Sequence, residues 1–157
     1  MKGIEKLFEQ FLRTRGLRLT KQREAILKAI YATHDHISAD DLYDELMDDE
    51  GWSALKISRA TVYRTLSLLT DGGFIQSLDI GGGQGQLYEH VMGHEHHDHM
   101  VCLGCRQIFE FHDEELEELQ AKVVKKHGFK ANSHRLNVFG TCAKCLEKGE
   151  QSVAMKG

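Results

Sequence analysis

The chain has 157 residues, of which 41% are hydrophobic and 28% are charged, and its formal net charge is −4. This composition is typical of a folded globular protein and argues against intrinsic disorder. No apolar run is long enough to cross a membrane, and the first residues lack the apolar core of a secretory signal peptide. We therefore expect a cytoplasmic protein with one mid-sized domain or two small ones.

The negative net charge hides an uneven distribution along the chain. Residues 1–28 carry eight Lys or Arg against three Asp or Glu, whereas residues 35–50 carry eight acids and no Lys or Arg. Residues 56–64 contain three basic side chains and no acid. Binding to DNA phosphates requires a basic face, not a basic protein, so the composition is compatible with DNA binding.

Apolar residues at helical spacing predict four short helices in the first half of the chain. Their predicted first residues or N-caps are Ile4, Thr20, Ser38 and Ser58. The period then changes, and residues 74–80 and 86–91 are predicted to form two strands joined by a glycine-rich turn. Helices followed by such a hairpin are typical of a winged helix, in which Ser58–Leu69 would be the recognition helix.

The second half mixes strands with one helix. The predicted elements are strands at 100–102 and 108–111, a helix at 113–127 and an extended segment at 129–139. We place the boundary between the halves within 92–95, which divides the chain into domains 1–92 and 93–157. The expected fold class is α+β, with an N-terminal winged helix-turn-helix domain followed by a small α/β domain.

Two Cys-x-x-Cys pairs, Cys102 with Cys105 and Cys142 with Cys145, are the strongest chemical signal. Two thiolates three residues apart on a tight turn can chelate one ion, and two such turns complete a closed tetrahedron. A reducing cytoplasm favours this metal site over disulfides. The alternatives are four unrelated buried cysteines or one redox-active pair. Because no coordination position stays open, we expect a structural Zn²⁺ that contributes directly to folding.

The segment His94–His99 contains four histidines, one glutamate and one aspartate. Alternate residues of a strand share a face, so His97 and His99 point one way while His96 and Asp98 point the other. One segment can thus supply imidazole and carboxylate ligands to two metal sites. Such ligand sets suit iron, manganese, zinc or nickel without selecting among them. The alternative is a solvated polar loop.

The segment Arg59–Arg64 is the candidate nucleic-acid-binding surface. Its two arginines, together with Thr61 and Tyr63, offer phosphate donors and an aromatic face beside the inward-facing Val62. The alternative is a solvated helix face with no ligand.

Taken in chain order, the motifs of this sequence resemble those of the ferric uptake regulator (Fur) family of dimeric bacterial repressors. The resemblance is carried by Thr20-x-x-Arg23, Ile37–Tyr43, Ala60–Arg64, Tyr88-Glu89, His96–His99 and the two cysteine pairs. It implies a homodimeric, metal-dependent repressor that binds pseudo-palindromic double-stranded operator DNA. The C-terminal α/β domain would then be the dimerisation domain, and the DNA contacts would include Arg18 near the minor groove and Tyr63 with Arg64 in the major groove.

The resemblance also implies three metal sites. The structural zinc ligands are the four cysteines. The ligands of a regulatory divalent metal, Fe²⁺ or alternatively Mn²⁺ or Zn²⁺, are His36, Glu89, His97, His99 and Glu110. The ligands of a further site are His96, Asp98, Glu117 and His134. Because His90 directly follows Glu89, either residue of that strand can be the regulatory ligand. Without the resemblance, His36 would be assigned to a solvated loop.

The expected function is repression of metal-uptake genes in response to a metal, with iron as the expected effector. Glu110 favours this function, because peroxide-sensing members of the family commonly carry aspartate there. Sensing of peroxide, zinc or manganese is the alternative within the family. A zinc-dependent hydrolase or a metal buffer is the alternative from another class. No His-Glu-x-x-His helix is present, and either alternative leaves the Ala60–Arg64 segment or the wing unexplained, so we expect no enzyme activity.

Overall fold

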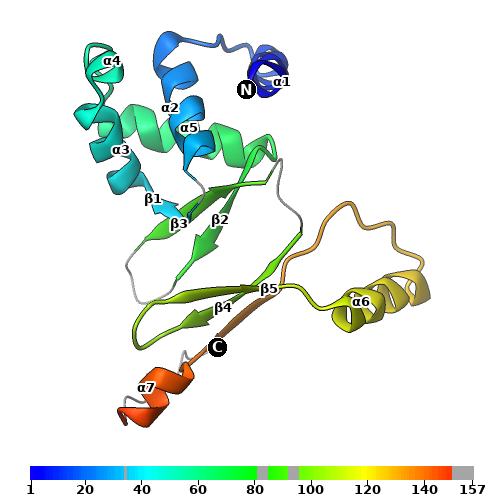
Figure 1. Ribbon diagram of the computed structural model, residues 1–157. Helices are drawn as coiled ribbons and strands as arrows, with labels where there is room; N and C mark the ends of the chain where they lie inside the picture. The colour runs from blue at the N-terminus through cyan, green and yellow to red at the C-terminus, as the bar shows by residue number, and fades with distance from the viewer. Residues whose placement is uncertain (34, 81–84, 92–95, 150–157) are drawn as a thin grey trace. The chain divides into compact units, whose positions relative to one another are not determined.

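The computed structural model describes residues 1–33, 35–80, 85–91 and 96–149 (Figure 1). The chain forms two compact units, Met1–His94 and Glu95–Gly157. The predicted domain boundary at 92–95 and most of the predicted glycine-rich turn, 81–84, lie outside the described residues. None of the helices in the described part of the chain is long and apolar enough to cross a membrane.

Within its described residues, the first unit combines five helices with a small antiparallel sheet. Its elements are α1 (Lys2–Thr14), α2 (Lys21–Ala32), β1 (Ile37–Ser38), α3 (Ala39–Asp48), α4 (Glu50–Ser53), α5 (Arg59–Asp71), β2 (Ile75–Asp79) and β3 (Gln86–His90). The strand order is β1-β3-β2, and in Figure 1 the helices gather on one side of this sheet. The two short elements β1 and α4 were not predicted, because two to four residues are too few to show a hydrophobic period.

Side-chain caps begin three of these helices at the predicted residues. Thr20, Ser38 and Ser58 each accept a hydrogen bond from the backbone N–H three residues further along, at 3.3, 3.1 and 3.2 Å. Each cap satisfies one of the backbone donors that a helix leaves unpaired at its N-terminus. The three capping predictions are therefore confirmed.

The core of the first unit lies where these helices meet the sheet. Its fully buried side chains include Phe8, Leu12, Ile26, Leu27, Ile30, Leu42, Leu46, Leu66, Leu69 and Ile75. From α5, Val62, Leu66 and Leu69 all point into this core and are 0% exposed. Their spacing of four and three residues marks one face of a helix. Tyr63 lies outside this face and is exposed.

The described part of the second unit, residues 96–149, is a three-stranded mixed sheet with two helices. Its elements are β4 (Asp98–Cys102), β5 (Ile108–Phe111), α6 (Glu114–Lys126), β6 (Asn137–Gly140) and α7 (Ala143–Glu147). Strand β4 is central, antiparallel to β5 and parallel to β6. Parallel strands need a long crossover connection, which contains α6. None of the thirteen residues of α6 is buried, and Leu119 is 57% exposed.

Two boundaries in the second unit differ from the prediction. Strand β4 begins at Asp98, two residues before the predicted Met100, so only the last two residues of the histidine segment lie in the strand. The regular strand in the predicted extended segment is limited to Asn137–Gly140. The short helix α7 was not predicted.

Candidate metal centres and nucleic-acid interface

The four cysteines come together at one end of the second unit. Cys102 ends β4 and Cys105 follows in the turn toward β5, whereas Cys142 caps α7 and Cys145 lies within it. The parallel register pairs Cys102 with Gly140, so β6 delivers the second cysteine pair beside the first. All four are free thiols, and their Sγ atoms lie within 4.8 Å of one another.

The sulfur geometry fits a tetrahedral zinc ion. The Sγ atoms of Cys102 and Cys145 are 3.8 Å apart, and those of Cys105 and Cys142 are 3.7 Å apart. With Zn–S bonds of about 2.3 Å, the corners of an ideal tetrahedron are about 3.8 Å apart. The backbone N–H of Cys142 donates to Sγ of Cys102 at 3.2 Å, and this bond, with further backbone donors, lowers the pKa of Cys102 to about 6. The site therefore favours the thiolate that zinc requires.

In the first unit, His36 and Glu89 form a pair of potential ligands. His36 directly precedes β1, and β1 pairs with β3 so that Ile37 lies opposite Tyr88. This register brings Nε2 of His36 to 3.4 Å from Oε1 of Glu89, with side chains only 10% and 11% exposed. Gln76 lies opposite Glu89 on β2 and donates a side-chain hydrogen bond to the same carboxylate.

His90 lies on the other face of β3. Its ring stacks on that of Tyr31 at 4.9 Å between centroids and 19° between planes. Tyr31 itself donates a hydrogen bond to the Phe74 carbonyl at 2.7 Å, and burial raises the pKa of Tyr31 to about 12. Neighbouring strand residues face opposite sides, so Glu89, not His90, accompanies His36. The choice between Glu89 and His90 as regulatory ligand stays a prediction, and Glu89 is the one that lies next to His36.

The second unit brings together His97, His99 and Glu110. The rings of His97 and His99 are 5.0 Å apart between centroids, and Nε2 of His97 is 3.9 Å from Oε1 of Glu110. Glu110 lies directly opposite His99 in the β4–β5 pair. The β-hairpin therefore gathers three of the predicted regulatory ligands.

A separate cluster contains the predicted ligands of the further metal site. His96, Asp98, Glu117 and His134 each place one ligand atom within 4.8 Å of the others. Nε2 of His134 is 3.1 Å from Oε1 of Glu117, and Nε2 of His96 is 3.4 Å from the same oxygen. Glu117 comes from the first turn of α6, so the cluster joins that helix to the start of β4. Two imidazoles and two carboxylates form an N/O set that suits a divalent transition metal.

The exposed face of α5 carries the candidate DNA-contacting side chains. Tyr63 is 49% exposed, and Arg64 is also exposed. The hydroxyl of Thr61 lies 2.9 Å from that of the capping Ser58, so it belongs to the cap of the helix. Arg18 is exposed in the segment between α1 and α2, where its carbonyl accepts a hydrogen bond of 2.6 Å from the Arg23 guanidinium.

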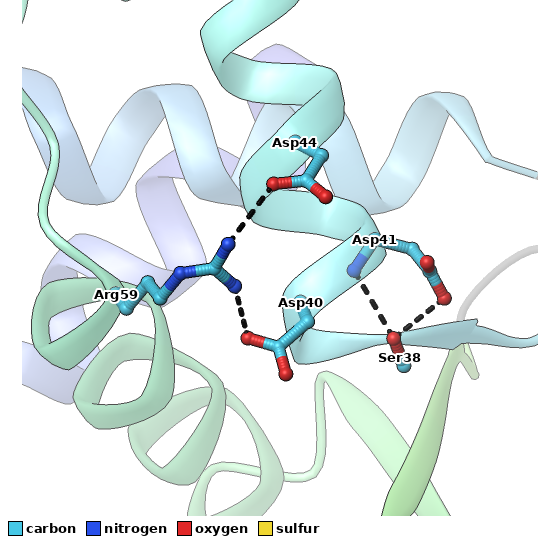
Figure 2. A network of polar contacts seen from close by, with 5 residues as sticks. All are labelled: Ser38, Asp40, Asp41, Asp44 and Arg59. Atoms are coloured by element: carbon cyan, nitrogen blue, oxygen red, sulfur yellow. Dashed lines mark hydrogen bonds and ion pairs between the residues drawn. The ribbon is translucent and has the colours of Figure 1, made fainter.

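Arg59 differs from the other predicted DNA-contacting residues, because its guanidinium is bound to α3. Figure 2 shows one nitrogen bonded to Asp40 and the other to Asp44, the latter at 3.2 Å. The guanidinium carbon also lies 4.3 Å from the centre of the Tyr43 ring. No local pattern predicts these contacts, because their partners lie 15 to 19 residues away in the sequence.

Sequence reasoning also missed a contact that positions the start of α5. The Gln22 side chain of α2 donates hydrogen bonds to the carbonyls of Leu55 and Lys56, at 3.0 and 3.4 Å. Lys56 has a φ of 48°, a left-handed conformation that is uncommon for a residue with a side chain. Gln22 thus ties the turn before α5 to α2.

Comparison with known proteins assigns the chain to a family. The model of the ferric uptake regulator family matches residues 14–139. The ferric uptake regulation protein of Campylobacter jejuni is 40% identical over 138 residues, which cover 88% of this chain and 85% of that protein. The solved structure of Helicobacter pylori Fur, which reveals three functional metal binding sites, is 33% identical, with a TM-score of 0.70 and coverage of 90% and 93% of the two chains.

A peroxide stress regulator belongs to the same group of similar structures. The Campylobacter jejuni protein is 31% identical, with a TM-score of 0.63 and coverage of 79% of this chain and 88% of that one. These similarities confirm the predicted α+β fold class and the predicted class of metal-responsive regulator. The chain belongs to the ferric uptake regulator family.

Proposed function

We propose that this chain is an iron-responsive repressor that binds operator DNA as a homodimer and controls metal-uptake genes. The observation that carries the proposal is the division of ligands into a closed Cys₄ set and mixed His/carboxylate groups that lie within each unit. Four thiolates fill a tetrahedral zinc shell and leave no open position, as a structural site requires. Mixed imidazole and carboxylate ligands instead suit an exchangeable divalent metal.

The structural zinc is held by Cys102, Cys105, Cys142 and Cys145. Bound there, Zn²⁺ supplies a cross-link between the two cysteine pairs. The sulfur atoms that approach each other belong to residues 43 apart (Cys102 and Cys145) and 37 apart (Cys105 and Cys142) along the chain. Because the apolar core of the second unit is small, this cross-link contributes directly to its folding.

The regulatory metal is bound by His36 and Glu89 from the first unit together with His97, His99 and Glu110 from the second. Neither group alone supplies a full coordination shell, so one ion shared by both groups favours conformations in which the units have one particular relative orientation. Coupling of this kind is typically about 1–3 kcal/mol, which changes DNA occupancy severalfold or more. The set His96, Asp98, Glu117 and His134 is a further metal site that fixes α6 to β4.

Iron is the effector that we favour among the possible metals. The chain is 40% identical to a ferric uptake regulation protein over 138 residues. It also carries Glu110 at a position where the resemblance associates aspartate with peroxide sensing.

Apolar side chains on the second unit support dimerisation. Leu119 and Val123 on α6, Met100 on β4 and Val138 on β6 are all 42% to 57% exposed. Exposed apolar surface of this kind is typical of a face that another protein covers. A second copy of the unit would bury these side chains, and the resulting two-fold symmetry would present two α5 helices to a pseudo-palindromic operator.

The experiment measures metal-dependent binding to a fluorescent DNA duplex that the Mn²⁺-loaded protein has selected from a random pool. The zinc-loaded protein is titrated with Fe²⁺ without oxygen, and with Mn²⁺ and Zn²⁺. We expect DNA binding to require the added metal. We expect His36→Ala and His97→Ala each to abolish metal-activated DNA binding while zinc content and dimer mass stay unchanged. His96→Ala is the matched control, because it changes a histidine of the same segment outside the regulatory set.

Two outcomes would contradict this proposal. Equal DNA binding with and without metal would refute metal-dependent repression, and a wild-type response in His36→Ala would refute the shared regulatory site. Peroxide sensing is tested in the same assay: loss of DNA binding after brief peroxide treatment of the Fe²⁺ protein, with oxygen added to His36 or His97 in the mass spectrum, would identify that function instead.

A further inference from the structure

Arg59 occupies an unusual place for a basic residue. It is the first residue of α5, directly after the Ser58 cap, and the first turn of that helix contains no acid. The N-terminus of a helix carries a partial positive charge that disfavours a cation. The presence of Arg59 there is therefore not explained by the stability of α5 alone.

The contacts of Arg59 explain its position. Tyr43 and Asp44 lie three and four residues after Asp40, so all three side chains lie on the same side of α3. Arg59 binds both carboxylates (Figure 2). Its guanidinium carbon also lies over the ring of Tyr43, 4.3 Å from the ring centre. A planar guanidinium offers forked donors to two carboxylates while its flat face stacks on a ring, a geometry that the compact ammonium of lysine does not match.

The same contacts change the charge next to the recognition helix. Asp40 and Asp44 are 59% and 65% exposed, and they belong to the stretch 35–50, which holds eight acids and no Lys or Arg. Two like charges four residues apart repel each other, and both would repel DNA phosphates. The Arg59 guanidinium offsets this repulsion while both of its terminal nitrogens stay engaged with α3.

We propose that Arg59 is a positioning residue, which holds the start of α5 against α3 and neutralises Asp40 and Asp44, instead of a residue that contacts DNA. The proposal rests on the proposed function, because it concerns how α5 is presented to DNA. It replaces the expectation from sequence that Arg59 donates to a phosphate. It also distinguishes Arg59 from Arg64, which lies further along the exposed side of the same helix.

The test is a double-mutant cycle on DNA affinity at fixed salt, with the same selected duplex and Mn²⁺. We expect Arg59→Ala to weaken binding on the order of tenfold in the wild-type background. In the Asp40→Asn/Asp44→Asn background, we expect the same change to cost less than about threefold, because the charges that Arg59 neutralises are already absent. Arg59→Lys keeps the charge without the bridge and should bind with intermediate affinity.

Arg64→Ala is the matched control, since it removes an arginine from the same helix. As a direct contact, it should cost the same in both backgrounds, within about twofold, and should lower the dependence of affinity on salt. If Arg59→Ala behaves in the same way, with equal losses in both backgrounds, the positioning proposal is wrong and Arg59 contacts DNA.

A measurement without DNA separates this proposal from the proposed function. Amide hydrogen exchange in a peptide covering the first turn of α5 should become faster in Arg59→Ala, and no faster still when Asp40→Asn and Asp44→Asn are added. Unchanged exchange in Arg59→Ala would overturn the positioning role, whether or not the protein binds DNA. Failure of the wild-type protein to bind any duplex would refute the proposed function alone.

Discussion

Replacement of Leu66 by alanine tests how α5 is held in place. Leu66 is 0% exposed and belongs to the inward face of α5, in the core shared with α2 and α3. Truncation of a fully buried leucine removes apolar contacts and leaves a cavity, which costs about 2–5 kcal/mol. A loss of about 3 kcal/mol is a large share of the 5–15 kcal/mol by which a typical domain is stable.

The single tryptophan of the chain makes this effect measurable. Trp52 lies in α4 and packs against the core of the first unit, so its fluorescence reports on unfolding of that unit. With a urea m-value of about 1.5 kcal/mol per molar, a loss of about 3 kcal/mol lowers the unfolding midpoint by about 2 M. Leu7→Ala, at a position 45% exposed on α1, is the control and should shift the same signal by less than about 0.5 kcal/mol. A loss below about 1 kcal/mol for Leu66→Ala would refute the close packing of α5.

Four further predictions concern the cysteine metal site, the turn before α5 and the exposed face of α5. Cys142→Ser should release the tightly bound zinc, as measured by elemental analysis, and a full zinc equivalent in this variant would exclude the Cys₄ site. Because the pKa of Cys102 is lowered to about 6, its thiolate stabilises the metal-free fold. This stabilisation is complete above the ordinary thiol pKa of 9.0, and urea titrations should show it lost as the pH falls through about 6. Lys56→Gly should raise the free energy of unfolding by up to about 1 kcal/mol, because glycine adopts a φ of 48° without strain; a lower urea midpoint would contradict this. Tyr63→Ala should weaken binding to the selected duplex more than to random DNA, and equal weakening of both would show that Tyr63 reads no bases.

Local features were predicted well from the sequence. The caps at Thr20, Ser38 and Ser58 depend on a hydroxyl and a backbone N–H three residues apart, so the sequence contains everything that forms them. The inward stripe of α5 follows from helical periodicity in the same way. The cysteine pairs also identified their own chemistry, because a spacing of three residues alone places two thiolates on one turn.

Contacts between distant segments were decided only by the tertiary structure. The sequence predicted Glu89 as a ligand and left His90 as its possible replacement, and the pairing of β1 with β3 turns Glu89 toward His36 and His90 toward Tyr31. Strand register depends on packing and on hydrogen bonds between segments about fifty residues apart, so no local pattern contains it.

Arg59 illustrates the same limit for function. Its sequence neighbours suggested a phosphate donor, because a basic residue at the start of a recognition helix has the right chemistry for DNA. The packing of α3 beside α5 instead places two carboxylates and an aromatic ring around its guanidinium. The sequence by itself determined which side chains can bind metal or DNA, and the tertiary structure decided which of them are already bound to one another, because that depends on distances across the fold.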